Sequence, residues 1–308
     1  MFQWNFSFFK STIEIHINKG GFILSKQTIS HLPDHYTLGD AFSNQHGIRC
    51  YPATDNRTGM RYVAKVQTFP YSPSVTEAFL LSGAFESEND VDAYYHDLGS
   101  DLCRQAAILN AFSHTAYFSH FTACEMAKRN DGGYDVWLLA PFCTTLAAVF
   151  KKISLSKEKI LELGITLCRA LSLCREAGFL YTGIKPENIF LSNDGRFMIG
   201  DVGFIPLASL PYAALPLRRY TVYTPSDCHD CYCRLSDNLD VYSIGVVLYQ
   251  ACSGGTLPEK LAFPPKIDNK NLAEIIMTAC FPASDGRWKN PSEMEDALIA
   301  CQSETIKQ

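Results

Sequence analysis

The chain has 308 residues, 47% of them hydrophobic and 19% charged, which suits one two-lobed domain or two modest ones, each with its own core. Its net charge of -5 argues against a nucleic-acid surface, because binding to a phosphate backbone needs clustered Lys and Arg. No run of about 18 apolar residues is present, and the opening MFQWNFSFFK lacks the features of a secretory signal, so we expect a cytoplasmic protein without a membrane span.

The first half of the chain predicts an antiparallel sheet with one long helix. Residues 1–30 match no motif, and we treat them as an N-terminal extension. Apolar residues in 88–112 recur at spacings of three and four, which indicates one face of a helix that Gly99 is expected to break or bend. Strand-type runs occur at YTL (36–38), GIRCYPA (47–53), RYVAKVQTF (61–69), FSHFTACEMA (118–127) and YDVWLLA (134–140), the last two joined by the hairpin signal Asn130-Asp131-Gly132-Gly133.

The second half predicts a mainly helical lobe that follows a hinge near 139–143. Residues 157–177 carry one apolar stripe, with Ser156 as the N-cap and Gly178 just past the end. Strand-type runs IFL and FMIG then flank a turn at 192–195, and further helices are expected near 238–252, 271–280 and 292–303. Strands with one helix, followed by a helical lobe, predict an α+β fold.

The segment 181–203, YTGIKPENIFLSNDGRFMIGDVG, carries the most chemical information in the chain. Lys185, Asn188 and Asp201 stand at the spacing of a metal-and-phosphate site between two short strands. Gly183 occupies the position at which a phosphoryl-transfer enzyme would carry its catalytic aspartate. The segment therefore predicts a site that can hold nucleotide but is poorly equipped to transfer phosphate.

This segment resembles the catalytic and metal-binding loops of Ser/Thr protein kinases, through KPEN at 185–188 and DVG at 201–203, and KPENIF resembles bacterial members most. Two further runs agree with the resemblance, VAK at 63–65 and DVYSIGV at 240–246. The resemblance covers about 34–303 and implies a bilobal protein-kinase-like fold. It implies a sheet-rich N-lobe over 31–140 with one main helix, and a mainly helical C-lobe over 141–308.

The resemblance also assigns roles to single residues. Lys65 would pair with the α and β phosphates of ATP, and Gln105 stands where a glutamate usually holds that lysine. A neutral amide lacks the Coulombic part of such an ion pair, so we expect Lys65 to be less firmly oriented. Asn188 and Asp201 would bind Mg²⁺, and Lys185 would stabilise charge on the transferring phosphate.

Other positions depart from the family pattern. Tyr181-Thr182-Gly183 replaces His-Arg-Asp, so the base is absent, as is the arginine that reads a phosphate on the activation segment. The loop after Leu38 and Gly39, over 40–47, is longer and poorer in glycine than a phosphate-covering loop, which predicts a weaker grip on nucleotide. Val202 replaces a phenylalanine, which leaves a smaller apolar contact beside the metal aspartate.

The end of the activation segment can be aligned in two ways, on Thr224-Pro225-Ser226 or on Pro225-Ser226-Asp227, and in the second Asp227 could pair with Arg287. Tyr220, Thr221, Tyr223 and Thr224 can be read as phosphoacceptors beside Arg218 and Arg219, or as a polar loop. The missing arginine of the catalytic loop favours the polar loop. We interpret Asp240 as structural, a buried carboxylate that accepts backbone hydrogen bonds.

The cysteines offer one alternative site. Cys228, Cys231 and Cys233, with His229 between them, can hold zinc in principle, but no second Cys or His pair lies at a familiar zinc spacing. The incomplete ligand set favours a loop with incidental thiols over Zn²⁺. Five of the twelve cysteines sit in apolar helical patterns and are expected to be reduced core residues: Cys103, Cys168, Cys174, Cys252 and Cys280.

Three functions remain open on the sequence, and none of them names a protein partner or substrate. The first is a pseudokinase that binds Mg-ATP weakly and acts through protein contacts. The second is a slow or unconventional Ser/Thr kinase. A general base contributes about 10²–10⁴-fold to the rate and kinases turn over at roughly 1–100 s⁻¹, so a kinase without its base would retain a turnover on the order of 10⁻⁴–1 s⁻¹. The third is a scaffold that binds no nucleotide.

Overall fold

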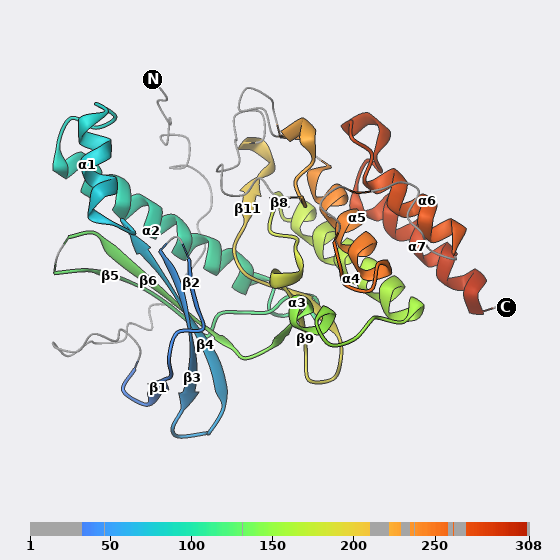
Figure 1. Cartoon of the computed structure of the whole chain (residues 1–308), viewed down its shortest axis with the longest axis horizontal. Coiled ribbons are helices and arrows are strands. Elements are labelled where there is room, and N and C mark those ends of the chain that lie inside the picture. The colour runs from blue at the N-terminus through green and yellow to red at the C-terminus, as the bar shows by residue number, and fades with distance from the viewer. Residues whose placement is uncertain are drawn as a thin grey trace.

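The computed structural model describes residues 33–45, 47–130, 132–209, 222–228, 235–236, 238–257, 261 and 269–306. These residues form a sheet-rich lobe and a helical lobe, joined after β6 and lying side by side in Figure 1. The expectations for 1–30, for 218–221 and for the zinc ligands at 229–233 fall outside the described residues.

An antiparallel sheet forms the first lobe. The six-stranded sheet has the order β1-β3-β4-β6-β5, and β2 pairs with the remaining end of β3. Because side chains alternate along a strand, Ala64 and Val66 of β4 are buried against Trp137 and Leu139, while Lys65 lies on the opposite face. The strands are β1 (Tyr36–Leu38), β2 (Ser43–Gln45), β3 (Ile48–Asp55), β4 (Arg61–Phe69), β5 (Ala123–Lys128) and β6 (Tyr134–Pro141).

The long helix of this lobe, α2 (Glu88–Ala111), lies across the sheet behind β5 and β6 (Figure 1). Its N-cap is Ser87, whose side chain accepts a hydrogen bond from the Asp90 backbone. The helix continues through Gly99, so the expected break at this residue is wrong. A β-carbon at Gly99 would lie 2.5 Å from the Met126 sulfur, and glycine is therefore needed for the close approach of helix and sheet. The short helix α1 (Pro73–Leu81), which the sequence did not predict, precedes α2.

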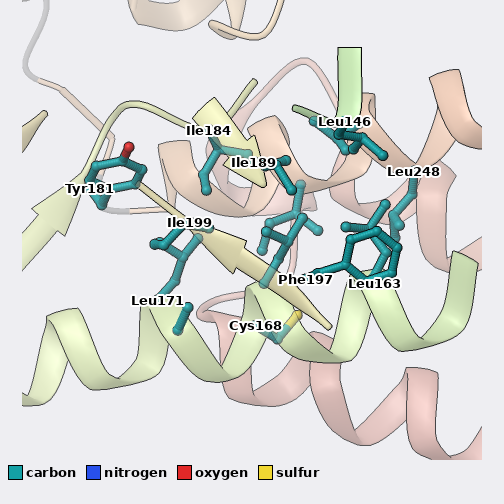
Figure 2. Packing of buried hydrophobic residues seen from close by; sticks show 14 of the residues in the cluster. Leu146, Leu163, Cys168, Leu171, Tyr181, Ile184, Ile189, Phe197, Ile199 and Leu248 are labelled. Atoms are coloured by element: carbon teal, nitrogen blue, oxygen red, sulfur yellow. The ribbon is translucent and has the colours of Figure 1, made fainter. Parts of the chain in front are cut away.

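Helices form the second lobe around one large core. The stripe predicted on α4 is confirmed: Leu163, Leu167 and Leu171 are fully buried, and Ser156 caps the helix as expected. In Figure 2, Leu163, Cys168 and Leu171 of α4 pack beneath Phe197 and Ile199. The helices are α3 (Leu146–Phe150), α4 (Lys157–Glu176), α5 (Leu239–Cys252), α6 (Lys270–Ala279) and α7 (Pro291–Ile306).

Short strand pairs in this lobe position the candidate site. β10 pairs with β9 and β9 with β7, while β11 pairs with β8, so that Tyr181 lies opposite Phe204. This pairing brings the segments before Gly183 and after Asp201 together, although they are far apart in the sequence. The strands are β7 (Thr144–Thr145), β8 (Phe179–Tyr181), β9 (Ile189–Leu191), β10 (Phe197–Ile199) and β11 (Phe204–Pro206).

The described cysteines are free thiols, and those predicted for the core are buried or half-buried. Burial raises the pKa of Cys252 and of Cys280 to about 12, so both remain protonated at neutral pH. Cys228 is also buried and packs with Leu180 and Leu239, as a small apolar residue does.

Candidate nucleotide site

An ion pair between the two lobes marks the centre of the candidate site. Lys65 extends from β4, and its Nζ lies 2.6 Å from both carboxylate oxygens of Asp201, which follows β10. The two side chains are 19% and 22% exposed. Asp201 has a φ of 68°, a left-handed conformation that non-glycine residues seldom adopt and that is common at functional sites. The resemblance assigned Lys65 and Asp201 to one nucleotide site, with phosphate and metal as their partners, but it did not predict that they pair with each other.

The charge of Asp201 is set by its neighbours. Burial acts to raise the pKa of Asp201, but the Lys65 ammonium, the Val202 backbone N–H and the Lys185 charge outweigh it and hold the pKa below its ordinary value. The carboxylate is therefore ionised at neutral pH. It is a suitable oxygen ligand for a hard cation such as Mg²⁺.

Asn188 lies at the end of a short turn, Pro186–Asn188, and its backbone bonds to Gly200, the residue before Asp201. The side-chain Nδ2 of Asn188 donates to the Gly183 carbonyl oxygen at 3.0 Å. The backbone carbonyl oxygen of Asn188 accepts from the Gly200 N–H at 2.9 Å. The first bond orients the side chain so that Oδ1 is the atom with which Asn188 would bind a cation. The catalytic-loop segment and the segment before Asp201 are thereby joined.

The space beside Gly183 is filled by Tyr181. A β-carbon at position 183 would lie 2.5 Å from the Tyr181 hydroxyl oxygen and 2.6 Å from the ring carbon that bears it. Tyr181 is fully buried, and its hydroxyl donates to the Gly200 carbonyl oxygen. Figure 2 shows the ring at one end of the buried cluster, near Ile184 and Ile199. The aromatic side chain thus takes volume that any side chain at position 183 would need.

Gln105 holds the chain beyond Asp201. Its Nε2 donates to the Phe204 carbonyl oxygen at 2.7 Å, and its Oε1 accepts from the N–H groups of Phe204 and Gly203 at 2.7 and 3.2 Å. These bonds tie α2 to β11 instead of to Lys65, to which the resemblance had linked position 105. An amide suits this role because it donates and accepts at once, whereas a carboxylate would only accept.

We expect Gln105→Ala to lower the free energy of unfolding by about 1–3 kcal/mol, because it leaves buried backbone groups of Gly203 and Phe204 without these partners. Hydrogen exchange at the two amides should accelerate. Arg104→Ala is the matched control, since Arg104 is exposed and pairs with Asp101, three residues earlier, at 2.8 Å. Equal exchange rates at Gly203 and Phe204 in wild type and Gln105→Ala would contradict the assignment.

The segment after Gly39 differs from expectation. The structure replaces the expected long loop with a hydrogen-bonded ribbon, because β2 folds back on β3 with Gln45 opposite Ile48. The Gly39 N–H donates to the Pro52 carbonyl oxygen at 2.8 Å, and the Phe42 N–H donates to the Cys50 carbonyl oxygen at 3.0 Å. The amides of Gly39 and Phe42 are thus engaged within the sheet.

Two ion pairs in the helical lobe each have one fully buried side chain. Arg287 lies 2.9 Å from Asp227, which selects the second of the two alignments of the activation segment. Asp240 accepts from Arg175 at 2.7 Å and from the Val241 N–H at 2.9 Å, so its predicted structural role is confirmed. Burial raises the pKa of Asp240, and Arg175 and the Val241 N–H act against that rise.

The fold and these residues define a protein kinase domain. The protein kinase domain model matches residues 97–307, more than half of the chain, and the chain belongs to this family. It is 31% identical over 143 residues to serine/threonine-protein kinase Nek1 of Mus musculus, covering 44% of this chain and 11% of that protein. A probable serine/threonine-protein kinase of Clostridium perfringens is 25% identical over 190 residues, 55% of this chain and 27% of the relative. Human serine/threonine-protein kinase 16 is 23% identical over 192 residues, which cover 53% of this chain and 62% of that protein.

The chain spans less than two thirds of the length of each of these relatives. Protein kinase domains in general use ATP and Mg²⁺. Within the described ranges, no group of three or more His, Cys, Asp or Glu side chains could hold a metal on its own. The described helices include none that is long and apolar enough to cross a membrane.

Proposed function

We propose that this protein kinase domain is a pseudokinase that binds Mg-ATP weakly, transfers little or no phosphate and acts through protein contacts. Its kinase-like domain occupies about 34–303, with lobes over 31–140 and 141–308, in a cytoplasmic protein. One observation carries the proposal: position 183 has no side chain, and the Tyr181 hydroxyl fills the adjacent volume in which a base would begin.

The retained residues fit a nucleotide. Three observations support this: Lys65 of β4 pairs with Asp201, the Lys185 charge acts on Asp201, and Asn188, in the same loop as Lys185, donates to the Gly183 carbonyl oxygen. In this assignment, Lys65 and Lys185 bind phosphate oxygens, and Asn188 and Asp201 bind the metal. Bound Mg-ATP would supply the phosphoryl group and the divalent charge.

Weak binding follows from the contact that nucleotide must replace. Lys65 donates to both oxygens of Asp201, so phosphate must compete for the ammonium and Mg²⁺ must compete for the carboxylate. Breaking this half-buried pair subtracts from the free energy gained on binding. The engaged amides of Gly39 and Phe42 remove further phosphate donors.

Thermal unfolding with and without Mg-ATP tests nucleotide binding. At 100 times its Kd, Mg-ATP should stabilise the protein by about 2.7 kcal/mol. Lys65→Met and Asp201→Asn should abolish this gain. Lys128→Met is the matched control and should retain it, because Lys128 pairs with Asp92 on the surface of the same lobe. Lack of stabilisation by millimolar Mg-ATP in the wild-type protein would contradict the proposal and favour a nucleotide-free scaffold.

A second candidate is a slow or unconventional Ser/Thr kinase, favoured by the preserved arrangement of Lys65, Lys185, Asn188 and Asp201. Because phosphoryl transfer depends largely on positioning and charge stabilisation, these groups could support residual turnover without a base. Transfer of radiolabel from ATP to protein hydroxyls, lost in Asp201→Ala, would establish this function. No labelling with either Mg²⁺ or Mn²⁺ would support the pseudokinase.

A further inference from the structure

Helix α2 and strand β5 run in opposite directions and are linked near both ends. At one end, Lys128 lies 2.9 Å from Asp92. At the other end, Asn110 exchanges hydrogen bonds of 2.8 Å with the backbone of Phe121, the residue just before the strand region. The helix is therefore fixed along the strand, and advancing on α2 means going backwards on β5.

Between these ends, the register places two cysteines against each other. Gly99 lies directly on Met126, where a β-carbon would come within 2.5 Å of the sulfur. One helical turn later, about 6 Å along α2, stands Cys103. Two residues earlier on the same face of β5, about 7 Å along the strand, stands Cys124. Gly99 brings helix and strand close together, so this register places Cys103 and Cys124 at the same level of the seam.

The two thiols interact directly. A hydrogen bond from Cys124 lowers the pKa of Cys103 despite its burial, and the same interaction, together with burial, raises the pKa of Cys124. Cys124 is exposed and Cys103 is half-buried, so small solutes can reach the pair. Of the two, Cys103 is the thiol more readily deprotonated, and thiolates are the species that oxidants attack.

We propose that Cys103 and Cys124 form a site of reversible thiol oxidation, at which a disulfide joins α2 to β5. The oxidant class is a hydroperoxide. The Cys103 thiolate attacks the peroxide, one oxygen passes to its sulfur as a sulfenic acid, and the other leaves as water after protonation. The Cys124 sulfur then displaces the second oxygen as water, so that two thiols and one hydrogen peroxide yield one disulfide and two water molecules.

The disulfide would act on α2 because Gln105, which ties this helix to β11, stands on the same helix just after Cys103. A covalent link at the seam holds α2 against the sheet in the folded protein. It stabilises the fold chiefly because it restricts the conformations of the unfolded chain. This proposal does not depend on whether the chain binds nucleotide or transfers phosphate.

The experiment uses the whole chain, treated with hydrogen peroxide and then with an alkylating reagent before mass spectrometry. We expect a mass loss of about 2 Da before alkylation and two fewer alkyl groups after it, and dithiothreitol should reverse both. Peptide mapping should link Cys103 to Cys124, and the oxidised protein should melt at a higher temperature than the reduced protein. Because mapping needs no variant, the result does not depend on the folding of a mutant.

Cys103→Ser and Cys124→Ser should each abolish the mass loss and the rise in melting temperature. Cys143→Ser is the matched control: Cys143 is also a half-buried free thiol, and this variant should cross-link as the wild type does. Stable sulfinic acid at Cys124 with no link to Cys103, or a disulfide between other cysteines under the same treatment, would overturn the proposal.

Discussion

Gly183→Asp alone is expected to leave phosphoryl transfer at the wild-type level and to destabilise the protein by about 1–3 kcal/mol, the usual cost of overpacking a core. The reason is steric, since the new β-carbon would meet the Tyr181 hydroxyl oxygen at 2.5 Å. The Tyr181→His, Gly183→Asp double variant should avoid this clash. Its rate of radiolabel transfer from Mg-ATP to a peptide hydroxyl should exceed that of the wild type by about 10²–10⁴-fold, the usual worth of a general base.

Tyr181→His alone is the matched control, because it opens the space but supplies no carboxylate, and it should show no gain in transfer. Full activity in Gly183→Asp alone would contradict the role of Tyr181. A double variant that folds and binds Mg-ATP, yet transfers no phosphate, would mean that the defect lies elsewhere, for example in the engaged amides after Gly39. The free energy of unfolding of each variant separates these outcomes from misfolding.

Tyr181 and Gly183 also show what the sequence could not predict. The motif order assigned Lys65 and Asp201 to one site, but their direct ion pair was not predicted from the sequence. The absent base at Gly183 was visible as well. That Tyr181 fills the vacated volume depends on a close approach between side chain and backbone, which no periodicity or spacing reports. The link between glycine at position 183 and tyrosine at position 181 therefore becomes visible only in the structure.

The same limit applies to other elements. Periodicity predicted α2 and α4 because each has many turns on which an apolar stripe can repeat. The short elements α3, β7, β8 and β11 went unpredicted because a few residues carry too little pattern. Position 105 was aligned from the helix register, but its partners are backbone groups of Gly203 and Phe204, and backbone groups carry no sequence signal. Burial and hydrogen bonding decide such contacts.

Arg287→Met is expected to cost up to about 3–5 kcal/mol in the free energy of unfolding, because it removes a fully buried guanidinium from its partner Asp227, which is itself 28% exposed. The Arg287 side chain is 0% exposed and lies 2.9 Å from Asp227. It also donates to the carbonyl oxygens of Phe281 and Pro282 at 2.7 and 2.6 Å. The variant removes all of these bonds at once while keeping most of the volume.

Chemical denaturation of Arg287→Met measures this cost, and Arg169→Met is the matched control. Arg169 pairs with Glu295 at 2.7 Å, as short as the bonds of Arg287, but it is 46% exposed. Exposed pairs contribute up to about 1 kcal/mol, so the control should stay near the wild type. Equal losses of stability in the two variants would show that burial does not increase the contribution of the Arg287 ion pair. A large loss confined to Arg287→Met would establish that this arginine fixes the end of the activation segment to the helical lobe through Asp227.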